Sequence, residues 1–203
     1  MAQNVPAAEL VEVPAAAPDP LPAAGHVEAP AAELAHIERH FTATAYVVAG
    51  GRTLLLWHRK LGMWLPPGGH CEPNEDPLQS ALREALEESG IAVELISPPD
   101  LLVLSEGTLD PVVVAPPAVI LIEAIRMAGQ PFHQHIDHVY YTQAVGPVDF
   151  AAPLPDGSAH HWFTPEELSG GEPRLAPDGR MVAIAEDVRL LGLRAIAAGS
   201  AVV

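Results

Sequence analysis

The sequence predicts an α/β or α+β domain in which a β-sheet lies between helices. Short segments rich in β-branched and aromatic residues recur along the chain. Two longer segments, residues 76–90 and 180–198, repeat apolar residues at helical spacing. Strands mixed with two substantial helices indicate a sheet that helices cover. With 203 residues, 49% of them hydrophobic, the chain can build one core of ordinary size.

Residues 1–38 are expected to form a flexible leader, and residues 39–203 the folded domain. The first 29 residues are dominated by Ala, Pro and acidic residues and contain no aromatic residue. Such a stretch buries too little apolar surface to offset the entropy that ordering would cost. A short helix over residues 31–40 is expected to lead into the domain.

The domain is predicted to begin with a β-hairpin. Residues 41–49 alternate between the two faces of a strand, residues 52–59 are also rich in β-formers, and Gly50-Gly51 between them is typical of a tight turn. The Pro- and Gly-rich residues 60–69 are expected to form a loop.

The rest of the chain alternates predicted strands with loops and ends in a helix. Residues 146–159 are expected to be a loop, 165–168 a helical turn and 180–198 the final helix. The apolar stripe of that helix is predicted to contain Met181, Ile184, Val188 and Leu191. The expected strands are 91–96, 100–104, 111–115, 118–127, 135–145 and 160–164.

The charge of the chain limits the partners it can have. Ten basic against twenty-six acidic residues give a formal net charge of -16, which argues against binding nucleic acid or an anionic membrane through a basic surface. An anionic small-molecule ligand would need a bridging metal ion.

Cys71 is the only cysteine, there is no basic segment typical of a secretory signal, and no apolar run approaches the roughly 20 residues of a spanning helix. We therefore expect a cytoplasmic protein.

The acidic segment over residues 76–90 has the start and stop signals of a helix. Asp76 is a good N-cap, Pro77 suits the first helical position, and Gln79 is compatible with a capping box. Gly90 can adopt the left-handed conformation that ends a helix. Its buried face is predicted to contain Leu78, Ala81, Leu82, Ala85 and Leu86.

Three carboxylates, Glu84, Glu87 and Glu88, fall within one arc of roughly 100° on this helix, away from the apolar face. Stacking like charges costs stability. Either the acids form a solvated face or they hold a hard cation such as Mg²⁺, which prefers oxygen ligands.

The residues around these acids decide between the two interpretations. Gly69 is followed by five residues, then Glu75, seven residues, Arg83-Glu84, Ala85, one residue, Glu87-Glu88, one residue, and Gly90-Ile91. This pattern resembles the Nudix box, G-x5-E-x7-R-E-U-x-E-E-x-G-U with U apolar, at every fixed position. The preceding WLPPGG also resembles the segment that leads into the box in this family, and the resemblance covers roughly residues 40–195.

The resemblance implies a Nudix-fold α/β/α sandwich with a mixed β-sheet and a Mg²⁺-dependent hydrolase, with Mn²⁺ as the alternative ion. It implies that Glu84, Glu87 and Glu88 bind the metal, with the Gly68 carbonyl as a further ligand. Arg83 and Glu75 are expected to pair and to fix the loop against the helix.

The general base is expected to be a carboxylate close to the metal. Glu84 is the first candidate. Some family members place the base on a loop outside the box, which leaves Asp149 and Asp156 as loop candidates and Glu123 as a weaker one.

Substrate contacts are expected from two further segments. Arg59 and Lys60 precede the box loop in a chain short of positive charge and could contact a phosphate. His133, His135 and Asp137 share one face of a predicted strand, which favours a polar sheet face lining the substrate cleft. A zinc site there lacks a cysteine or a further close histidine in the surrounding sequence.

The predicted function is cleavage of the pyrophosphate bond of a nucleoside diphosphate linked to another group. Family isomerases of isopentenyl diphosphate use a cysteine outside the box, whereas Cys71 lies inside it. A catalytically idle nucleotide-binding sensor is the alternative, although such proteins usually carry a degraded box. In this family the contacts that select the substrate come from loops outside the box. The expected partner is a small nucleotide-type diphosphate, and a homodimer is possible because dimers are common in the family.

Overall fold

A computed structural model of the chain describes residues 37–97, 113–126 and 131–201. Residues 1–36 of the leader predicted over residues 1–38, and the strand predicted over residues 100–104, lie outside these ranges. The main sheet contains eight strands. They are β1 (Glu38–Ala49), β2 (Arg52–His58), β3 (Met63–Leu65), β4 (Gly68–His70), β5 (Val93–Leu95), β6 (Val119–Ile125), β7 (His133–Ala144) and β8 (His160–Phe163).

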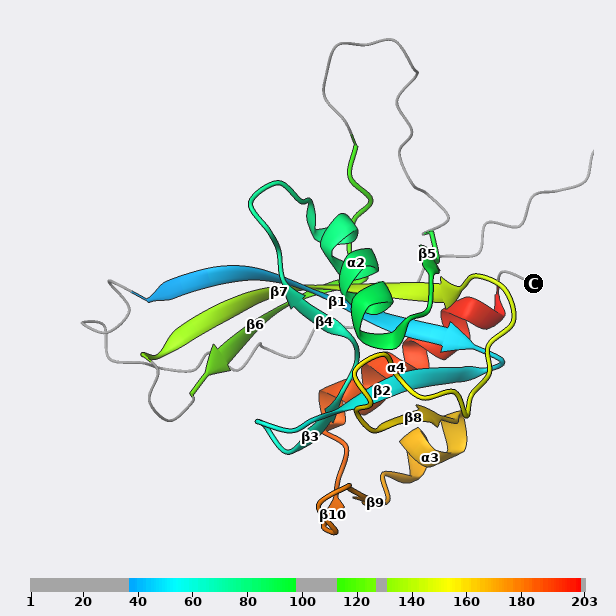
Figure 1. Cartoon of the computed structure of the whole chain (residues 1–203). Coiled ribbons are helices and arrows are strands. Elements are labelled where there is room, and N and C mark those ends of the chain that lie inside the picture. Colours follow the sequence, from blue (N-terminus) through cyan, green and yellow to red (C-terminus); the bar gives the residue numbers. More distant parts are fainter. Residues whose placement is uncertain (1–36, 98–112, 127–130, 202–203) are drawn as a thin grey trace, which may run out of the picture. The chain divides into compact units, whose positions relative to one another are not determined.

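The sheet is mixed. Strand β1 runs parallel to β7 and antiparallel to β2 and β4, while β7 pairs antiparallel with β5 and β6. The path through the sheet is β3-β2-β1-β7-β5, with β4 also on β1, β6 on β7 and β8 on β2. Strands β1, β6 and β7 extend together beyond the helices at one end of the sheet (Figure 1).

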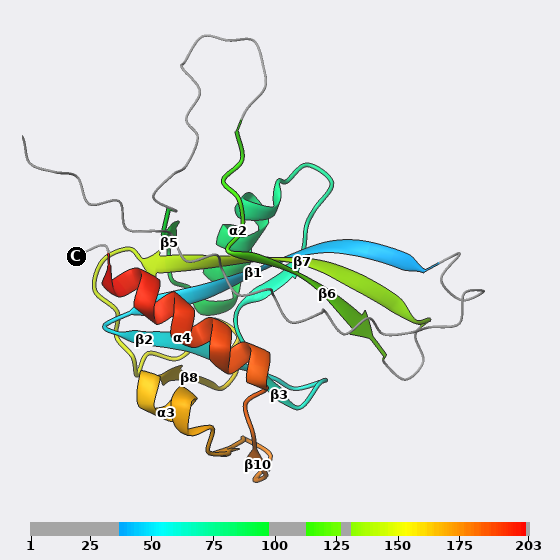
Figure 2. The ribbon, with the colours of Figure 1, turned by 180° about the vertical axis from the view of Figure 1, so that it is seen from behind.

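Two helices cover opposite faces of this sheet (Figures 1 and 2). Helix α2 (Pro77–Ser89) packs through small residues on one face, where Ala43 and Ala45 of β1 meet Ala81 and Ala85. Helix α4 (Glu186–Ser200) packs on the other. There Tyr46 and Val48 of β1 join the core formed by Val188, Leu191, Ala195 and Ile196. The predicted α/β/α sandwich with a mixed sheet is thus confirmed.

The predicted hairpin is confirmed, with Ala49 opposite Arg52 and with Gly50 and Gly51 both at positive φ, 53° and 72°. These φ values suit the tight turn that the twist of paired strands favours, and glycine adopts them without a Cβ clash.

Several predicted boundaries are wrong. Residues 60–69 are not a continuous loop, because the short strands β3 and β4 form on β2 and β1. In the segment predicted as a strand over 111–115, the described residues 113–115 form none. Residues 38–40, predicted as the end of a helix, instead lie in β1 and pair with β7.

The final helix begins later than predicted. Met181 and Val182 pair with Leu175 and Arg174 as the two-stranded sheet β9 (Arg174–Leu175) and β10 (Met181–Val182), so Met181 is exposed. The acidic first turn of α4 suits the positive end of the helix dipole. The short helix α3 (Pro165–Gly170) forms at the predicted helical turn.

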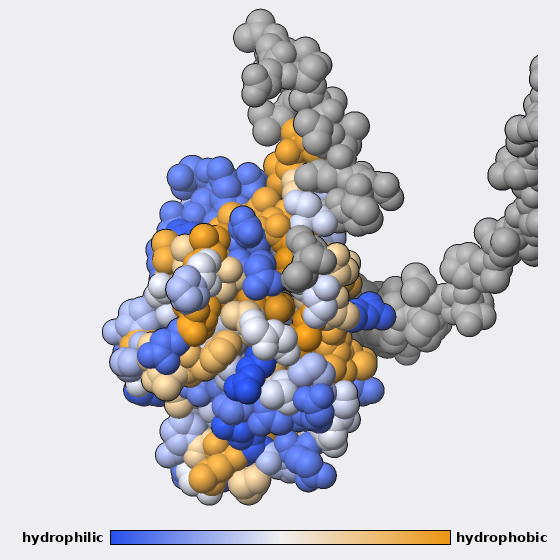
Figure 3. All heavy atoms as spheres, turned by 90° about the vertical axis from the view of Figure 1, so that its right-hand side faces the viewer, coloured by the Kyte–Doolittle hydropathy of each residue, from blue (hydrophilic) through white to orange (hydrophobic). Residues whose placement is uncertain are grey.

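No helix within the described ranges is long and apolar enough to cross a membrane. The face turned to the viewer in Figure 3 mixes hydrophilic and hydrophobic residues.

Candidate active site

Helix α2 carries the three box carboxylates and is fixed at both ends. The Asp76 side chain accepts the Gln79 N–H and the Gln79 side chain accepts the Asp76 N–H, which completes a capping box. Gly90 ends the helix at φ 72°. The face toward the sheet consists of Ser80, Ala81, Ala85 and Ser89.

The predicted burial of Leu86 is wrong, since this side chain is 50% exposed, while Leu78 and Leu82 are half-buried. Small residues instead face the sheet. Their size lets the helix approach closely enough for the carboxylates on its flank to reach the β4 backbone.

Glu84 lies against the backbone of Gly69. A Cβ atom at Gly69 would overlap the Glu84 carboxylate, so a larger residue there would force this carboxylate to move. The side chain of Glu84 is 16% exposed and accepts a hydrogen bond from Nη1 of Arg83 at 2.8 Å. The box glycine therefore admits an acidic side chain beside the middle of β4.

Glu88 accepts the Gly68 N–H at 3.1 Å. Burial raises the pKa of Glu88, and the nearby charges of Glu84, Asp156 and Glu87 act in the same direction, while the Gly68 N–H opposes them. A cation among these acids would remove this repulsion, and carboxylates offer the oxygen ligands that hard cations prefer. The carboxylate oxygens of Glu84, Glu87 and Glu88 are thus suitable ligands for Mg²⁺ or Mn²⁺.

Arg83 holds the acidic segment together. Its Nε lies 2.7 Å from Oε1 of Glu75 and its Nη2 lies 3.0 Å from Oε2, a bidentate pair. It also donates to the His70 carbonyl and to Glu84 and Glu87. The hydrogen bond from Arg83 lowers the pKa of Glu75, and Glu75 is the largest cause that raises the pKa of Arg83.

The structure separates the two loop acids. Asp156 lies close enough to Glu88 to raise the pKa of that residue, and Pro155 beside it lies next to Gly90 at the end of α2. Hydrogen bonds from Ser158 lower the pKa of Asp156, with a smaller effect from the charge of Arg59. Asp149 accepts the Ala151 N–H within its own turn.

The remaining predicted contacts occupy different environments. Arg59 and Lys60 are exposed after β2, and Arg59 is the one whose charge acts on Asp156. Asp137 is buried, and its Oδ1 accepts hydrogen bonds from the hydroxyls of Thr42 and Thr44. Its carboxylate is thus committed to ordering the sheet.

Glu123 and His135 face each other on β6 and β7, with His135 Nδ1 3.9 Å from Glu123 Oε2. Burial raises the pKa of Glu123 to about 7 and lowers that of His135 to about 4. His40 of β1 and His70 of β4 lie beside His135, at ring-centroid distances of 6.1 and 4.9 Å. Sequence reasoning missed these two histidines, because only strand pairing brings them to His135.

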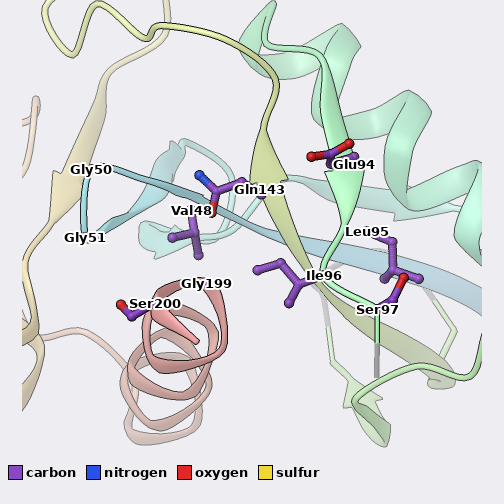
Figure 4. A pocket seen from close by; sticks show the side chains of 10 residues that line it. All are labelled: Val48, Gly50, Gly51, Glu94, Leu95, Ile96, Ser97, Gln143, Gly199 and Ser200. Carbon is purple, nitrogen blue, oxygen red and sulfur yellow. The ribbon is translucent and has the colours of Figure 1, made fainter. Parts of the chain in front are cut away.

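Two hollows differ in their relation to the box. The first, of about 680 Å³, lies where β5 and the end of β1 meet the end of α4 (Figure 4). It is lined by Val48, Glu94, Ile96 and Gln143 among others, and by none of the predicted site residues. The second, of about 540 Å³, opens beside His40, His70 and Glu75 and so adjoins the box loop.

Fold and site together define a Nudix protein. The family model of the NUDIX domain matches residues 38–183, so the chain belongs to the Nudix family. The crystal structure of a hydrolase of the NUDIX family from Clostridium perfringens superimposes with a TM-score of 0.57 at 27% identity, covering 79% of this chain and 98% of that one.

Two curated relatives match over short stretches. The m7GpppN-mRNA hydrolase NUDT17 of Bos taurus is 59% identical over 29 residues, which is 14% of this chain and 10% of that protein. The asymmetrical bis(5'-nucleosyl)-tetraphosphatase of Sus scrofa is 64% identical over 28 residues, 14% of this chain and 19% of that protein. The chain thus matches less than a fifth of the length of either curated relative.

Proposed function

We propose that this protein is a Mg²⁺-dependent hydrolase that cleaves the pyrophosphate bond of a nucleoside diphosphate linked to another group. The observation that carries the proposal is the complete box, with Glu84 and Glu88 brought to the backbone of Gly69 and Gly68. Membership in the Nudix family supports the same reaction class.

Glu84, Glu87, Glu88 and the Gly68 carbonyl would hold the metal. When bound, Mg²⁺ neutralises the diphosphate oxygens and lowers the pKa of the attacking water. The protein residues then have separate tasks. Glu84 accepts the proton of the water, with Asp156 as the loop alternative, because a base must lie within reach of that proton.

Arg83 and Glu75 act as positioning residues. Their bidentate pair links the box loop to α2, so the three α2 carboxylates keep their position relative to that loop. Arg59 is the proposed contact to a substrate phosphate, since its charge already acts on Asp156 beside the carboxylates. Lys60 and His135 remain weaker candidates for substrate binding, whereas the buried Asp137 carboxylate already accepts hydrogen bonds from Thr42 and Thr44.

The test is product release from a panel of nucleoside diphosphate derivatives, with Mg²⁺, with Mn²⁺ and with chelator. The panel includes a dinucleoside tetraphosphate and a cap analogue, because the two curated relatives are named for such substrates. Metal-dependent release that Glu87→Gln abolishes, and that the exposed Glu172→Gln retains, supports the hydrolase. A nucleotide that raises the melting temperature without being cleaved would instead favour a binding protein.

A further inference from the structure

Four histidines gather on the face of the sheet that α4 partly covers, at the end where β1, β6 and β7 extend beyond the helices. His40 lies on β1, directly opposite His135 of the parallel strand β7, and His133 precedes it by one step on the same face. His70 ends β4, opposite Thr42 of β1. Strands far apart in sequence thus bring four imidazoles to one place.

The ring nitrogens are close enough to share one ion. Single nitrogens of His40, His133 and His135 all lie within 4.8 Å of one another, the only such set of three His, Cys, Asp or Glu among the residues that the structure describes. Nδ1 of His40 lies 3.2 Å from Nε2 of His70. Zn–N bonds of about 2.0–2.1 Å at tetrahedral angles place two ligand nitrogens about 3.3 Å apart, so small rotations suffice.

The outer nitrogens of these rings already have partners that would orient them. Nε2 of His40 lies 2.9 Å from Oε1 of Glu38, which leaves its Nδ1 facing His70. Nδ1 of His133 lies 3.0 Å from the Pro131 carbonyl, which leaves its Nε2 free to bind. Metal-binding histidines typically donate their other N–H to a carboxylate or a carbonyl in this way.

His135 supplies a further sign of a missing ligand. Its Nε2 is buried and has no hydrogen-bond partner in the described part of the chain. A buried polar atom without a partner costs free energy, and stacking against neighbouring rings does not satisfy a nitrogen lone pair. A metal ion at the centre of the cluster would accept the lone pair of this nitrogen.

The geometry points to a binding site for one divalent transition-metal ion, such as Zn²⁺, formed by His40, His133 and His135 with His70 as a fourth ligand. Imidazole nitrogens suit Zn²⁺ and its neighbours in the transition series, whereas Mg²⁺ takes oxygen ligands. The site therefore differs in metal and in residues from the carboxylates of α2. The hollow beside His40 and His70 gives an ion access from solvent.

An ion bound by these histidines would link the neighbouring ends of β1 and β7 to β4. Because His70 lies inside the box, next to Gly69, the ion would also brace the strand against which Glu84 rests. The inference does not depend on the proposed hydrolysis, since it rests on the histidines alone.

The test is a zinc titration of the full chain, with any polyhistidine tag removed and Mg²⁺ in large excess to occupy the carboxylates. Competition with a chromophoric chelator is expected to show one bound Zn²⁺. His133→Ala and His135→Ala should each weaken binding by more than about 100-fold, because even the outer partners of a metal ligand contribute about 10–100-fold. His160→Ala, on β8 and outside the cluster, should bind as the wild type does.

Melting curves provide the second readout. Zn²⁺ should raise the melting temperature of the wild type and of His160→Ala, but not of His133→Ala. If His135→Ala fails to fold, His133→Ala decides, because the contact of the His133 ring with the Pro131 carbonyl lies on the exposed surface. Absence of stoichiometric binding to the wild type would overturn the site. So would zinc binding that survives in His133→Ala but is lost in Glu87→Gln, since the ion would then occupy the carboxylates.

Discussion

Arg83, in the middle of α2, donates two hydrogen bonds to Glu75 of the box loop, eight positions earlier in the chain. Nε lies 2.7 Å from Oε1 and Nη2 lies 3.0 Å from Oε2. Both side chains are largely shielded from solvent, at 23% and 13% exposure. This ion pair joins the two halves of the box. Its loss should lower both the free energy of unfolding and the activity.

Arg83→Lys should lower the free energy of unfolding by about 1–3 kcal/mol, because lysine cannot form the two-pronged pair and leaves Glu75 partly unsatisfied. Urea denaturation measures the change. Arg180→Lys is the matched control, since Arg180 pairs with Asp178 through two nitrogens on the exposed surface. If both variants lose equal stability, the box pair has no special role.

Gly69→Ala should keep the fold and lower kcat/KM at least about ten-fold, because the new Cβ would displace the Glu84 carboxylate. Steady-state kinetics on whichever substrate the panel identifies measures the loss. Gly170→Ala serves as the control, as a Cβ there meets nothing within 4 Å. Equal activity of the two alanine variants would contradict the inferred crowding at Glu84.

The two loop acids should differ in kinetics. Asp156→Asn is expected to reduce kcat/KM by about ten-fold or more, since Asp156 acts on Glu88, whereas Asp149→Asn should stay within about two-fold of wild type. Glu84→Gln should reduce kcat by about 10²–10⁴-fold if Glu84 is the base. If Asp156→Asn loses more kcat than Glu84→Gln, the general base is Asp156 on the loop and not Glu84.

His161 should stay neutral to lower pH than an ordinary histidine. Its Nδ1 lies 2.6 Å from Nη2 of Arg174 and its Nε2 3.0 Å from Glu167, and burial is the largest cause that lowers its pKa below 6.5. The unfolded chain then binds this proton more readily than the native one. The contribution to stability is present above pH 6.5 and is lost as the pH falls.

An NMR titration of the His161 ring measures this shift directly. Arg174→Gln should raise the midpoint, because the neighbouring positive charge opposes protonation, and Arg180→Gln should leave it unchanged. A wild-type midpoint at or above 6.5 would refute the assignment of a neutral, hydrogen-bonded ring.

The predictions that held are those that depend on neighbours in the chain. A cap, a proline and a terminal glycine define α2 within its own sequence, and two glycines suffice for the turn between β1 and β2. The carboxylate arc follows from the helical period alone. The predicted burial of Leu86 is wrong for a physical reason. The helical period fixes how side chains are oriented relative to one another, but packing against the sheet decides which side of α2 is buried.

The sequence by itself determined the box helix, the mixed strand-and-helix fold and the residues that mark the family, because these depend on short-range patterns. Only the tertiary structure decided that His40 and His70 join His133 and His135, since the parallel pairing of β1 with β7 joins residues 95 positions apart. It likewise decided that the charge of Asp156, and not that of Asp149, acts on the pKa of Glu88. Such contacts are set by the global packing of the sheet, which no local pattern encodes.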